Sequence, residues 1–179
     1  MTIEVNGIAH IQLTVANPRD CLPFWEKLCH FLSMQTLVKG DDVIYCIGSR
    51  TGILVRGAPA DKRSDTFDQD RSGLHHFCFR ARSNEDVDSI HEFVSGEATA
   101  RIVHGPQYDE FAPGYYSILF EDPDNIPQTA EEASTHPVFE IIDEVEVVNG
   151  GNLQEENRFA QGVVTVVGKK GTGGSDAHS

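Results

Sequence analysis

Two histidines of this chain occupy matched positions in a repeated sequence pattern. His10 lies in residues 7–15, and His76 lies 66 positions later in residues 73–81, which match the first segment in pattern. Neutral imidazole is the commonest side-chain ligand of protein-bound metals. The repeat therefore predicts that two half-domains hold one divalent metal ion between them through His10 and His76, or that both histidines contact a ligand directly.

Alternation along the two segments indicates which side chains share a face with each histidine. Each histidine falls on the polar face of a predicted strand. The polar partners are Gln12 and Thr14 in the first segment and Cys78 and Arg80 in the second. His75 falls on the apolar face beside Phe77, so alternation selects His76 as the ligand. Arg80 is a candidate for clamping a substrate carboxylate, with a solvent-exposed arginine at a strand end as the alternative.

The same elements are predicted to follow each histidine segment, namely one helix and three strands. The first helix begins at Asn17 and Pro18, a cap acceptor before a proline, and the second begins at Ser83, again 66 positions later. The predicted strands are 34–38, 43–47 and 53–55, then 100–104, 115–120 and 125–130. The sequence therefore predicts an α+β fold in which two βαβββ modules form a mixed-sheet cleft and each sheet is covered by a helix.

The predicted modules span about residues 3–56 and 73–130 and together form one domain, residues 1–130. A C-terminal extension, residues 131–179, follows this domain. Residues 138–148 and 163–167 of the extension are rich in β-branched residues and predict an added β-hairpin. Residues 171–179 are rich in glycine and are predicted to form a disordered tail.

Composition excludes several classes of function. The formal net charge of −14 argues against binding to nucleic acid, which requires clustered Lys and Arg. No apolar run approaches the roughly 20 residues that span a bilayer, and no secretory signal is recognisable, so a cytoplasmic protein is expected. The four cysteines show no CxxC spacing and are expected to be reduced, buried thiols.

The repeated pattern, together with the motifs at residues 113–116 (PGYY) and 120–125 (FEDPDN), resembles the vicinal oxygen chelate superfamily. That superfamily contains glyoxalase I, extradiol dioxygenases, fosfomycin-modifying enzymes and bleomycin-binding proteins. The resemblance covers about residues 3–130 and implies paired βαβββ modules around a divalent metal ion, often in dimers. A homodimer is therefore expected by resemblance, and the expected metal is Fe²⁺, Mn²⁺, Zn²⁺ or Ni²⁺.

The resemblance also assigns metal ligands. The histidine ligand of each module carries over to His10 and His76. The family's carboxylate ligand, seven places beyond the first aspartate of the Asp-Pro-Asp motif, falls on Thr129 in this chain. Glu131 lies two residues later on the same face of the predicted strand and is the candidate third ligand. A site with two histidines and one carboxylate is typical of non-haem Fe(II) oxygenases.

Tyrosine and acidic side chains near these motifs are further candidates. Tyr115 and Tyr116 alternate, so one of them faces the predicted cleft; Tyr116 is the candidate catalytic phenol, donating to a substrate oxyanion, with simple packing as the alternative. Glu121 and Asp122 are expected to shape the turn before the last strand.

The sequence predicts a metal-dependent enzyme of glyoxalase or dioxygenase type, a lyase, transferase or dioxygenase acting on a small molecule with vicinal oxygens. The alternatives are a metal-free small-molecule binding or sequestering protein of the bleomycin-resistance type and a degenerate interaction domain.

Overall fold

The computed structural model describes residues 7–48, 50–112, 114–132, 144–149 and 170–174. The chain divides into two compact units. The first unit contains the described residues up to Phe77, with residues 92–103 and 120–128. The second contains residues 78–91, the described residues within 104–119, and the described residues from 129 onward.

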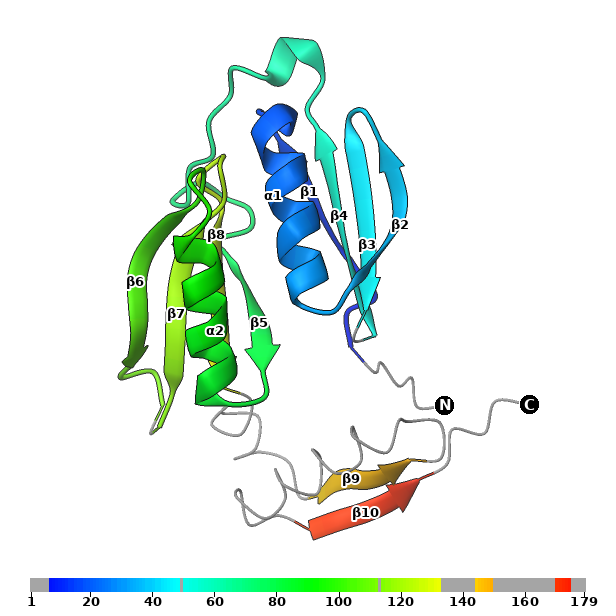
Figure 1. Ribbon diagram of the computed structural model, residues 1–179, viewed down its shortest axis with the longest axis vertical. Helices are drawn as coiled ribbons and strands as arrows, with labels where there is room; N and C mark the ends of the chain where they lie inside the picture. Colours follow the sequence, from blue (N-terminus) through cyan, green and yellow to red (C-terminus); the bar gives the residue numbers. More distant parts are fainter. Residues whose placement is uncertain (1–6, 49, 113, 133–143, 150–169, 175–179) are drawn as a thin grey trace, which may run out of the picture. The chain divides into compact units, whose positions relative to one another are not determined.

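The first βαβββ module is a four-stranded sheet with one helix along its face (Figure 1). Its elements are β1 (Ile11–Val15), α1 (Pro18–Phe31), β2 (Gln35–Gly40), β3 (Val43–Gly48) and β4 (Thr51–Gly57). The strand order is β1-β4-β3-β2. The pairing of β1 with β4 is parallel and the other two pairings are antiparallel, so the sheet is mixed.

Helix α1 begins where the sequence places a cap. The side chain of Asn17 accepts a hydrogen bond from the Asp20 amide at 3.4 Å, and Pro18 takes the first helical position, where its missing N–H is not needed. Pro23 lies inside the helix without ending it. The helix buries one apolar face, made of Cys21, Leu22, Phe24, Trp25, Leu28 and Cys29.

The second module repeats this plan. Its elements are β5 (Phe77–Ala81), α2 (Asn84–Ser95), β6 (Arg101–Tyr108), β7 (Tyr116–Glu121) and β8 (Pro127–Glu132), and the strand order is β5-β8-β7-β6. Ser83 caps α2 by accepting a hydrogen bond from the Asp86 amide at 3.2 Å. Figure 1 shows α2 along its own sheet. The predicted α+β fold with two βαβββ modules is confirmed, and the cleft between them stays a prediction.

The first strand of each module is shorter than predicted. The expected strands begin at Ile8 and Leu74, whereas β1 and β5 begin three residues later. In both places a glycine with positive φ precedes the strand, Gly7 at 131° and Gly73 at 154°. Glycine adopts such angles without the steric cost that other residues incur. The same backbone bend therefore leads into each module.

The described part of the C-terminal extension contains two paired strands. β9 (Glu144–Asn149) and β10 (Lys170–Gly174) pair in parallel, with a register shift between Thr172 and Gly173. The expected hairpin of residues 138–148 and 163–167 and the expected disordered tail both stay predictions. Residues 163–167 and 175–179 lie outside the described residues. The domain boundary at residue 130 stays a prediction.

No helix in the described part of the chain has the length and apolar character needed to cross a membrane.

Cys21, Cys29 and Cys46 are buried free thiols, as predicted, whereas Cys78 is exposed on β5, which corrects the expectation that all four are buried. Burial also raises the pKa of the Cys21 and Cys29 thiols.

Candidate functional site

The two predicted histidine ligands occupy the same place in their modules. His10 immediately precedes β1, and His76 immediately precedes β5. Both residues are exposed, and each lies three positions after a glycine with positive φ. The 66-residue repeat therefore holds at the level of the backbone, and it presents an accessible imidazole at the start of each module.

An aromatic ring borders His10. The rings of His10 and Tyr45 lie with centroids 6.4 Å apart at an interplanar angle of 78°, an edge-to-face arrangement. Tyr45 in β3 extends across Gly52 in β4 so closely that a Cβ atom at Gly52 would lie 2.6 Å from the Tyr45 Cε2 atom. Only glycine leaves this space, so Gly52 allows the tyrosine ring to lie on the strand beside His10.

His76 is bordered by polar groups instead. The Nδ1 atoms of His75 and His76 lie 2.7 Å apart, and the Nε2 atom of Gln69 lies 3.0 Å from His75 Nδ1. The Gln69 amide nitrogen is a donor, whereas the donor and the acceptor between the two ring nitrogens depend on the tautomers of His75 and His76. Metal-binding histidines are commonly oriented by such a hydrogen bond from the other ring nitrogen.

The arrangement of His75 corrects one prediction. Strand alternation places His75 on the apolar face with Phe77, whereas the structure exposes both His75 and His76 because β5 begins only at Phe77. Alternation does not extend to residues outside the strand. The pair of contacting histidines and its partner Gln69 was missed from the sequence; the adjacent histidines were the available signal.

The face of the first sheet away from α1 carries several exposed or half-buried side chains beside His10. Strand register places Gln12 next to Leu54 and Thr14 next to Arg56 in the parallel pair, and Tyr45 next to Leu54 in the antiparallel pair. The residues between them in sequence are buried, since Leu13, Ile53 and Val55 form the core. The exposed or half-buried side chains on this side of the sheet are here called the open face, which consists of Gln12, Thr14, Tyr45, Leu54 and Arg56.

The predicted third metal ligand is not assembled by the described residues. Thr129 lies in β8, and its Oγ1 atom is buried with no hydrogen-bond partner among the residues described. The backbone of Glu131 belongs to β8, but its side chain lies outside the described part of the structure. Within that part, no group of three or more His, Cys, Asp or Glu side chains is placed to hold a metal ion.

Arg80 and Tyr116, the predicted catalytic residues, lie in different surroundings. Arg80 is exposed on β5 and alternates with the buried Ala81. The Tyr116 hydroxyl donates a hydrogen bond to Asp88 of α2 at 2.7 Å, and this bond raises the pKa of Tyr116 to about 12. The Tyr116 ring also contacts Tyr108 at 5.0 Å between centroids. The phenol is therefore engaged with the helix side of its sheet.

The Asp-Pro-Asp motif shapes a turn, as predicted for Asp122. The Asp122 carboxylate accepts hydrogen bonds from the amides of Asp124 and Ile126 at 3.0 and 2.9 Å and from the indole of Trp25 at 2.9 Å. Burial raises the Asp122 pKa to about 6, although these bonds oppose the shift. The Asp124 carboxylate accepts from the amides of Ala16 and Asn17, at the start of α1. These aspartates support structure rather than acid–base chemistry.

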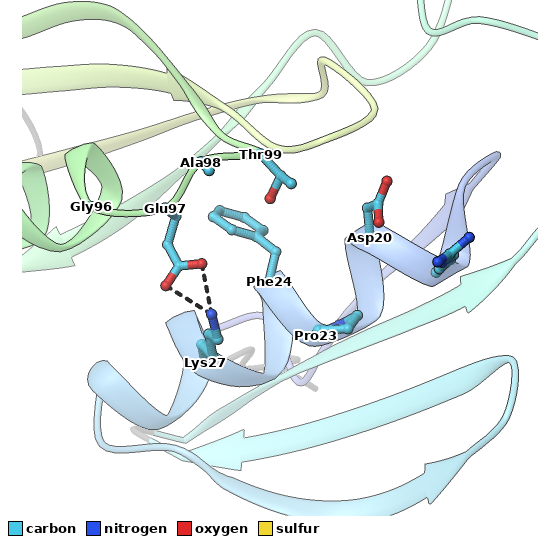
Figure 2. Close-up of a pocket in the computed structure, with 9 residues that line it drawn as sticks. Asp20, Pro23, Phe24, Lys27, Gly96, Glu97, Ala98 and Thr99 are labelled. Atoms are coloured by element: carbon cyan, nitrogen blue, oxygen red, sulfur yellow. Dashed lines mark hydrogen bonds and ion pairs between the residues drawn. The ribbon is translucent and has the colours of Figure 1, made fainter.

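Two surface hollows lie beside α1. The larger, about 390 Å³, is bordered by α1 and residues 96–99, with the ion pair of Lys27 and Glu97 (2.9 Å) at its edge (Figure 2). The smaller, about 230 Å³, is bordered by α1, β2 and β3 and includes Glu26 and Lys39. None of the predicted site residues lines either hollow.

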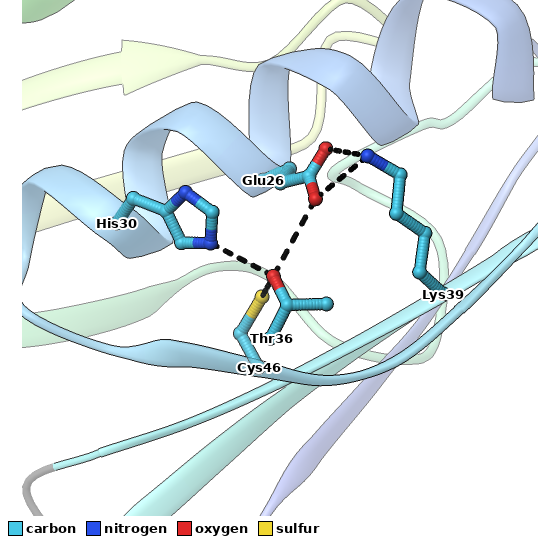
Figure 3. A network of polar contacts seen from close by, with 5 residues as sticks. All are labelled: Glu26, His30, Thr36, Lys39 and Cys46. Atoms are coloured by element: carbon cyan, nitrogen blue, oxygen red, sulfur yellow. Dashed lines mark hydrogen bonds and ion pairs between the residues drawn. The ribbon is translucent and has the colours of Figure 1, made fainter.

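Glu26, which borders the smaller hollow, belongs to a polar network (Figure 3). Lys39 Nζ lies 2.7 and 2.9 Å from the two Glu26 oxygens and holds the pKa of Glu26 below its usual range. Thr36 Oγ1 lies 2.8 Å from His30 Nε2 and 3.6 Å from Cys46 Sγ. This network joins α1 to β2 and β3, and it is a structural feature of the first module.

Comparison with protein families identifies one match. The model of the Glyoxalase/Bleomycin resistance protein/Dioxygenase superfamily matches residues 7–127, which include both modules up to the start of β8. No curated protein sequence matches the chain significantly.

Solved structures share the fold. A protein proposed to be a glyoxalase from Bacillus halodurans is 21% identical with a TM-score of 0.61, covering 71% of this chain and 96% of that one. A glyoxylase/bleomycin resistance protein/dioxygenase domain from Frankia sp. EAN1pec is 25% identical with a TM-score of 0.57, covering 72% and 98%. Lactoylglutathione lyase from Agrobacterium tumefaciens is 18% identical with a TM-score of 0.53, covering 72% and 94%.

Proposed function

The chain belongs to the Glyoxalase/Bleomycin resistance protein/Dioxygenase superfamily, and we propose that it is a metal-dependent enzyme acting on a small molecule with two adjacent oxygen atoms. The reaction class is that of a lyase, a transferase or a dioxygenase. His10 and His76 are the proposed metal ligands, and the metal is Fe²⁺, Mn²⁺, Zn²⁺ or Ni²⁺.

The placement of the two histidines carries this proposal. Each is exposed and immediately precedes the first strand of its module. A histidine kept only for packing would be buried, whereas a ligand must be accessible. The contact between His75 and His76 adds support, because a hydrogen bond at one ring nitrogen commonly orients a metal-binding histidine.

The chemistry of the two imidazoles fits a divalent ion. When bound, such an ion acts as a Lewis acid that stabilises negative charge developing on the substrate oxygens. The protein's part is to present the two imidazoles and to orient them, His10 beside the Tyr45 ring and His76 through His75.

Glu131 is the proposed third ligand. The orphaned Thr129 hydroxyl, two residues earlier in β8, supports a bound group in this region, because a buried hydroxyl without a partner costs on the order of 1–3 kcal/mol. A Glu131→Gln variant tests the assignment. Reduced metal occupancy is expected, and full occupancy would remove Glu131 from the site.

Arg80 and Tyr116 are proposed to have different roles. Arg80 is exposed on β5 and is proposed to hold a substrate carboxylate. Tyr116 can donate to a substrate oxyanion only by giving up its hydrogen bond to Asp88. We expect Arg80→Gln to raise KM, and Tyr116→Phe to lower kcat if the phenol acts on substrate. A Tyr116→Phe enzyme with unchanged kcat and reduced thermal stability would assign the phenol to structure.

Turnover assays test the reaction class. Oxygen uptake with catechols tests the dioxygenase branch, and glutathione-dependent turnover tests the lyase and transferase branches. The matched control is His91→Ala, which removes a third histidine at another place, in α2. Activity lost in His10→Ala and His76→Ala and kept in His91→Ala supports the proposal. Activity that survives both ligand substitutions contradicts it.

A metal-free protein that binds or sequesters a small molecule is the second candidate. It is favoured by threonine at the position of the family's carboxylate ligand and by the lack of a three-donor group among the described residues. Ligand binding that is unaffected by chelator treatment, in a protein without turnover, would support this candidate. The family also suggests a homodimer, which sedimentation analysis would test.

A further inference from the structure

We propose that the larger hollow beside α1 binds a free α-amino acid, with the carboxylate of the ligand on Arg19 and its ammonium group on Asp20. The nine residues that line this hollow all belong to the first compact unit. The inference goes beyond the proposed function and does not depend on it, because neither His10 nor His76 borders the hollow.

The size of the hollow suits a small ligand. Its volume is about 390 Å³. Sites for small molecules commonly measure roughly 300–1,000 Å³. The neighbouring hollow, at about 230 Å³, falls below this range. We therefore assign the ligand to the larger hollow.

The charges at the hollow indicate a ligand that carries both signs. Arg19 and Lys27 are positive and Asp20 and Glu97 are negative, so the four side chains sum to zero. The two carboxylates would repel a simple anion, and the two basic groups would repel a simple cation. A zwitterion can place each of its charges beside the opposite one.

Two of these four charges already neutralise each other. Lys27 Nζ lies 3.1 and 2.9 Å from the two Glu97 carboxylate oxygens. Figure 2 shows this pair at one end of the hollow and Asp20 at the other, with Phe24 between them. The Lys27–Glu97 pair is therefore a wall of the hollow, and Arg19 and Asp20 are left for the ligand.

Arg19 and Asp20 have unused hydrogen-bonding capacity. Asp20 Oδ2 accepts from the Asn17 side-chain amide at 2.7 Å, and Asp20 Oδ1 has no partner among the described residues. No described carboxylate forms an ion pair with Arg19. The same is true of Lys62 and Arg80, but these two border neither hollow, whereas Arg19 borders both. A guanidinium group binds a carboxylate through two parallel hydrogen bonds.

The positions of these groups match the chemistry of an α-amino acid. Arg19 and Asp20 are consecutive in α1. An α-amino acid carries its ammonium and carboxylate groups on one carbon atom, so side chains of opposite charge on neighbouring residues can bind both. Pro23 and Ala98 are the exposed apolar residues at the hollow, since Phe24 is buried. They suit an aliphatic side chain such as that of leucine.

Leucine is the probe, and NMR titration of the isotope-labelled full chain measures its binding. The protein is treated with chelator first, because α-amino acids also coordinate divalent metal ions. We expect saturable shifts of the amide signals of residues 96–99. Leucine amide lacks the carboxylate and N-acetylleucine lacks the ammonium group, so each should bind about tenfold more weakly or less, as loss of a charge-assisted hydrogen bond predicts. Leucylleucine, with its charges on separate residues, should also bind weakly, which distinguishes a free amino acid from a peptide.

Substitution of the two charged residues should show which group each one binds. Arg19→Gln and Asp20→Asn should each weaken leucine binding about tenfold or more. Arg19→Gln should no longer distinguish leucine from leucine amide, and Asp20→Asn should no longer distinguish leucine from N-acetylleucine. The matched controls are Lys62→Gln and Asp61→Asn, which change exposed residues of the short 3₁₀ helix Ala60–Lys62, outside both hollows. Both controls should bind leucine as wild type does.

Ala98→Leu tests the hollow itself. Ala98 is exposed, so a larger side chain can fill the hollow without disturbing the core. We expect leucine binding to be lost while the melting temperature changes little.

Four results would overturn the inference: no saturable binding of leucine by wild type, equal binding of leucine and its two derivatives, equal losses in the Arg19 and Lys62 variants, or full binding by Ala98→Leu. Because metal-free protein is used, none of these results bears on the metal-dependent enzyme. Loss of metal from His10→Ala and His76→Ala tests that proposal separately.

Discussion

The beginnings of the two modules are alike in backbone and different in the support of their histidines. Each begins with a glycine of positive φ, followed by an exposed histidine and a strand that alternates exposed polar with less exposed apolar residues. His10 is bordered by the ring of Tyr45, whereas His76 contacts His75, which is held by Gln69. The repeat therefore preserves the position of the imidazole, while each module orients it by its own neighbours.

The helices show a larger difference at matched positions. Trp25 of α1 corresponds to His91 of α2, 66 positions later. Trp25 is fully buried, stacks on Phe77 at 5.9 Å and donates to Asp122, whereas His91 is only partly buried. The first helix is thus tied to the Asp-Pro-Asp turn of the second module, and the duplicated fold has become asymmetric in its core.

Trp25→Ala tests this asymmetry and should cause the largest loss of stability. Truncating a buried aromatic side chain costs about 3–5 kcal/mol, and here it also removes the indole donor from the buried Asp122 carboxylate. Denaturant unfolding measures the loss. His91→Ala at the matched position should cost less than about 1.5 kcal/mol, because the residue is only partly buried. Equal losses in the two variants would show that the matched positions of the two helices contribute equally to stability.

The pH dependence of stability should report the same asymmetry through Asp122. Its pKa is raised from 3.8 to about 6 in the folded state, mainly by burial. Between these values the folded protein keeps a proton that the unfolded chain releases, so the free energy of unfolding falls as pH rises from about 4 to 6. The contribution is roughly 3 kcal/mol and is constant above this window.

Comparison with Asp122→Asn isolates this contribution, since other carboxyl groups titrate in both proteins. As the pH rises from about 4 to 6, the free energy of unfolding of wild type should fall relative to that of Asp122→Asn. A difference that is independent of pH would show that Asp122 titrates normally.

Substitutions at the two helix caps should have the smallest effects on stability, and the two effects should be nearly equal. Asn17 and Ser83 lie 66 positions apart and each accepts a hydrogen bond from the amide three residues later. We expect Asn17→Ala and Ser83→Ala each to lower the free energy of unfolding by about 1 kcal/mol, measured by denaturant titration. A cost confined to one variant would show that the caps are equivalent in geometry alone.

Local patterns of the sequence were sufficient for the fold. Cap residues, turn residues and alternation predicted both helices and the strands of both modules, because these signals act over a few residues. The parallel pairing of β9 and β10 depends on strands brought together over a long connection, for which no local pattern exists. The late starts of β1 and β5 depend on the bends at Gly7 and Gly73.

The candidate site was predictable only in part. The repeat selected His10 and His76, and the structure exposes both at matched positions. The contact of Tyr45 with Gly52 arises between two strands, and the bond of Tyr116 to Asp88 joins a strand to a helix. Such contacts depend on register, which a single sequence does not define, so the sequence could suggest Tyr116 as a catalyst but could not show its partner.

Metal content tests the central claim most directly. Protein purified without chelator is analysed by mass spectrometry as wild type, His10→Ala, His76→Ala and the control His91→Ala. The account predicts close to one divalent metal ion per chain in wild type and His91→Ala, and its loss in both ligand variants. Substoichiometric metal that responds to neither His10→Ala nor His76→Ala would contradict the claim that the two modules hold a metal ion through these histidines.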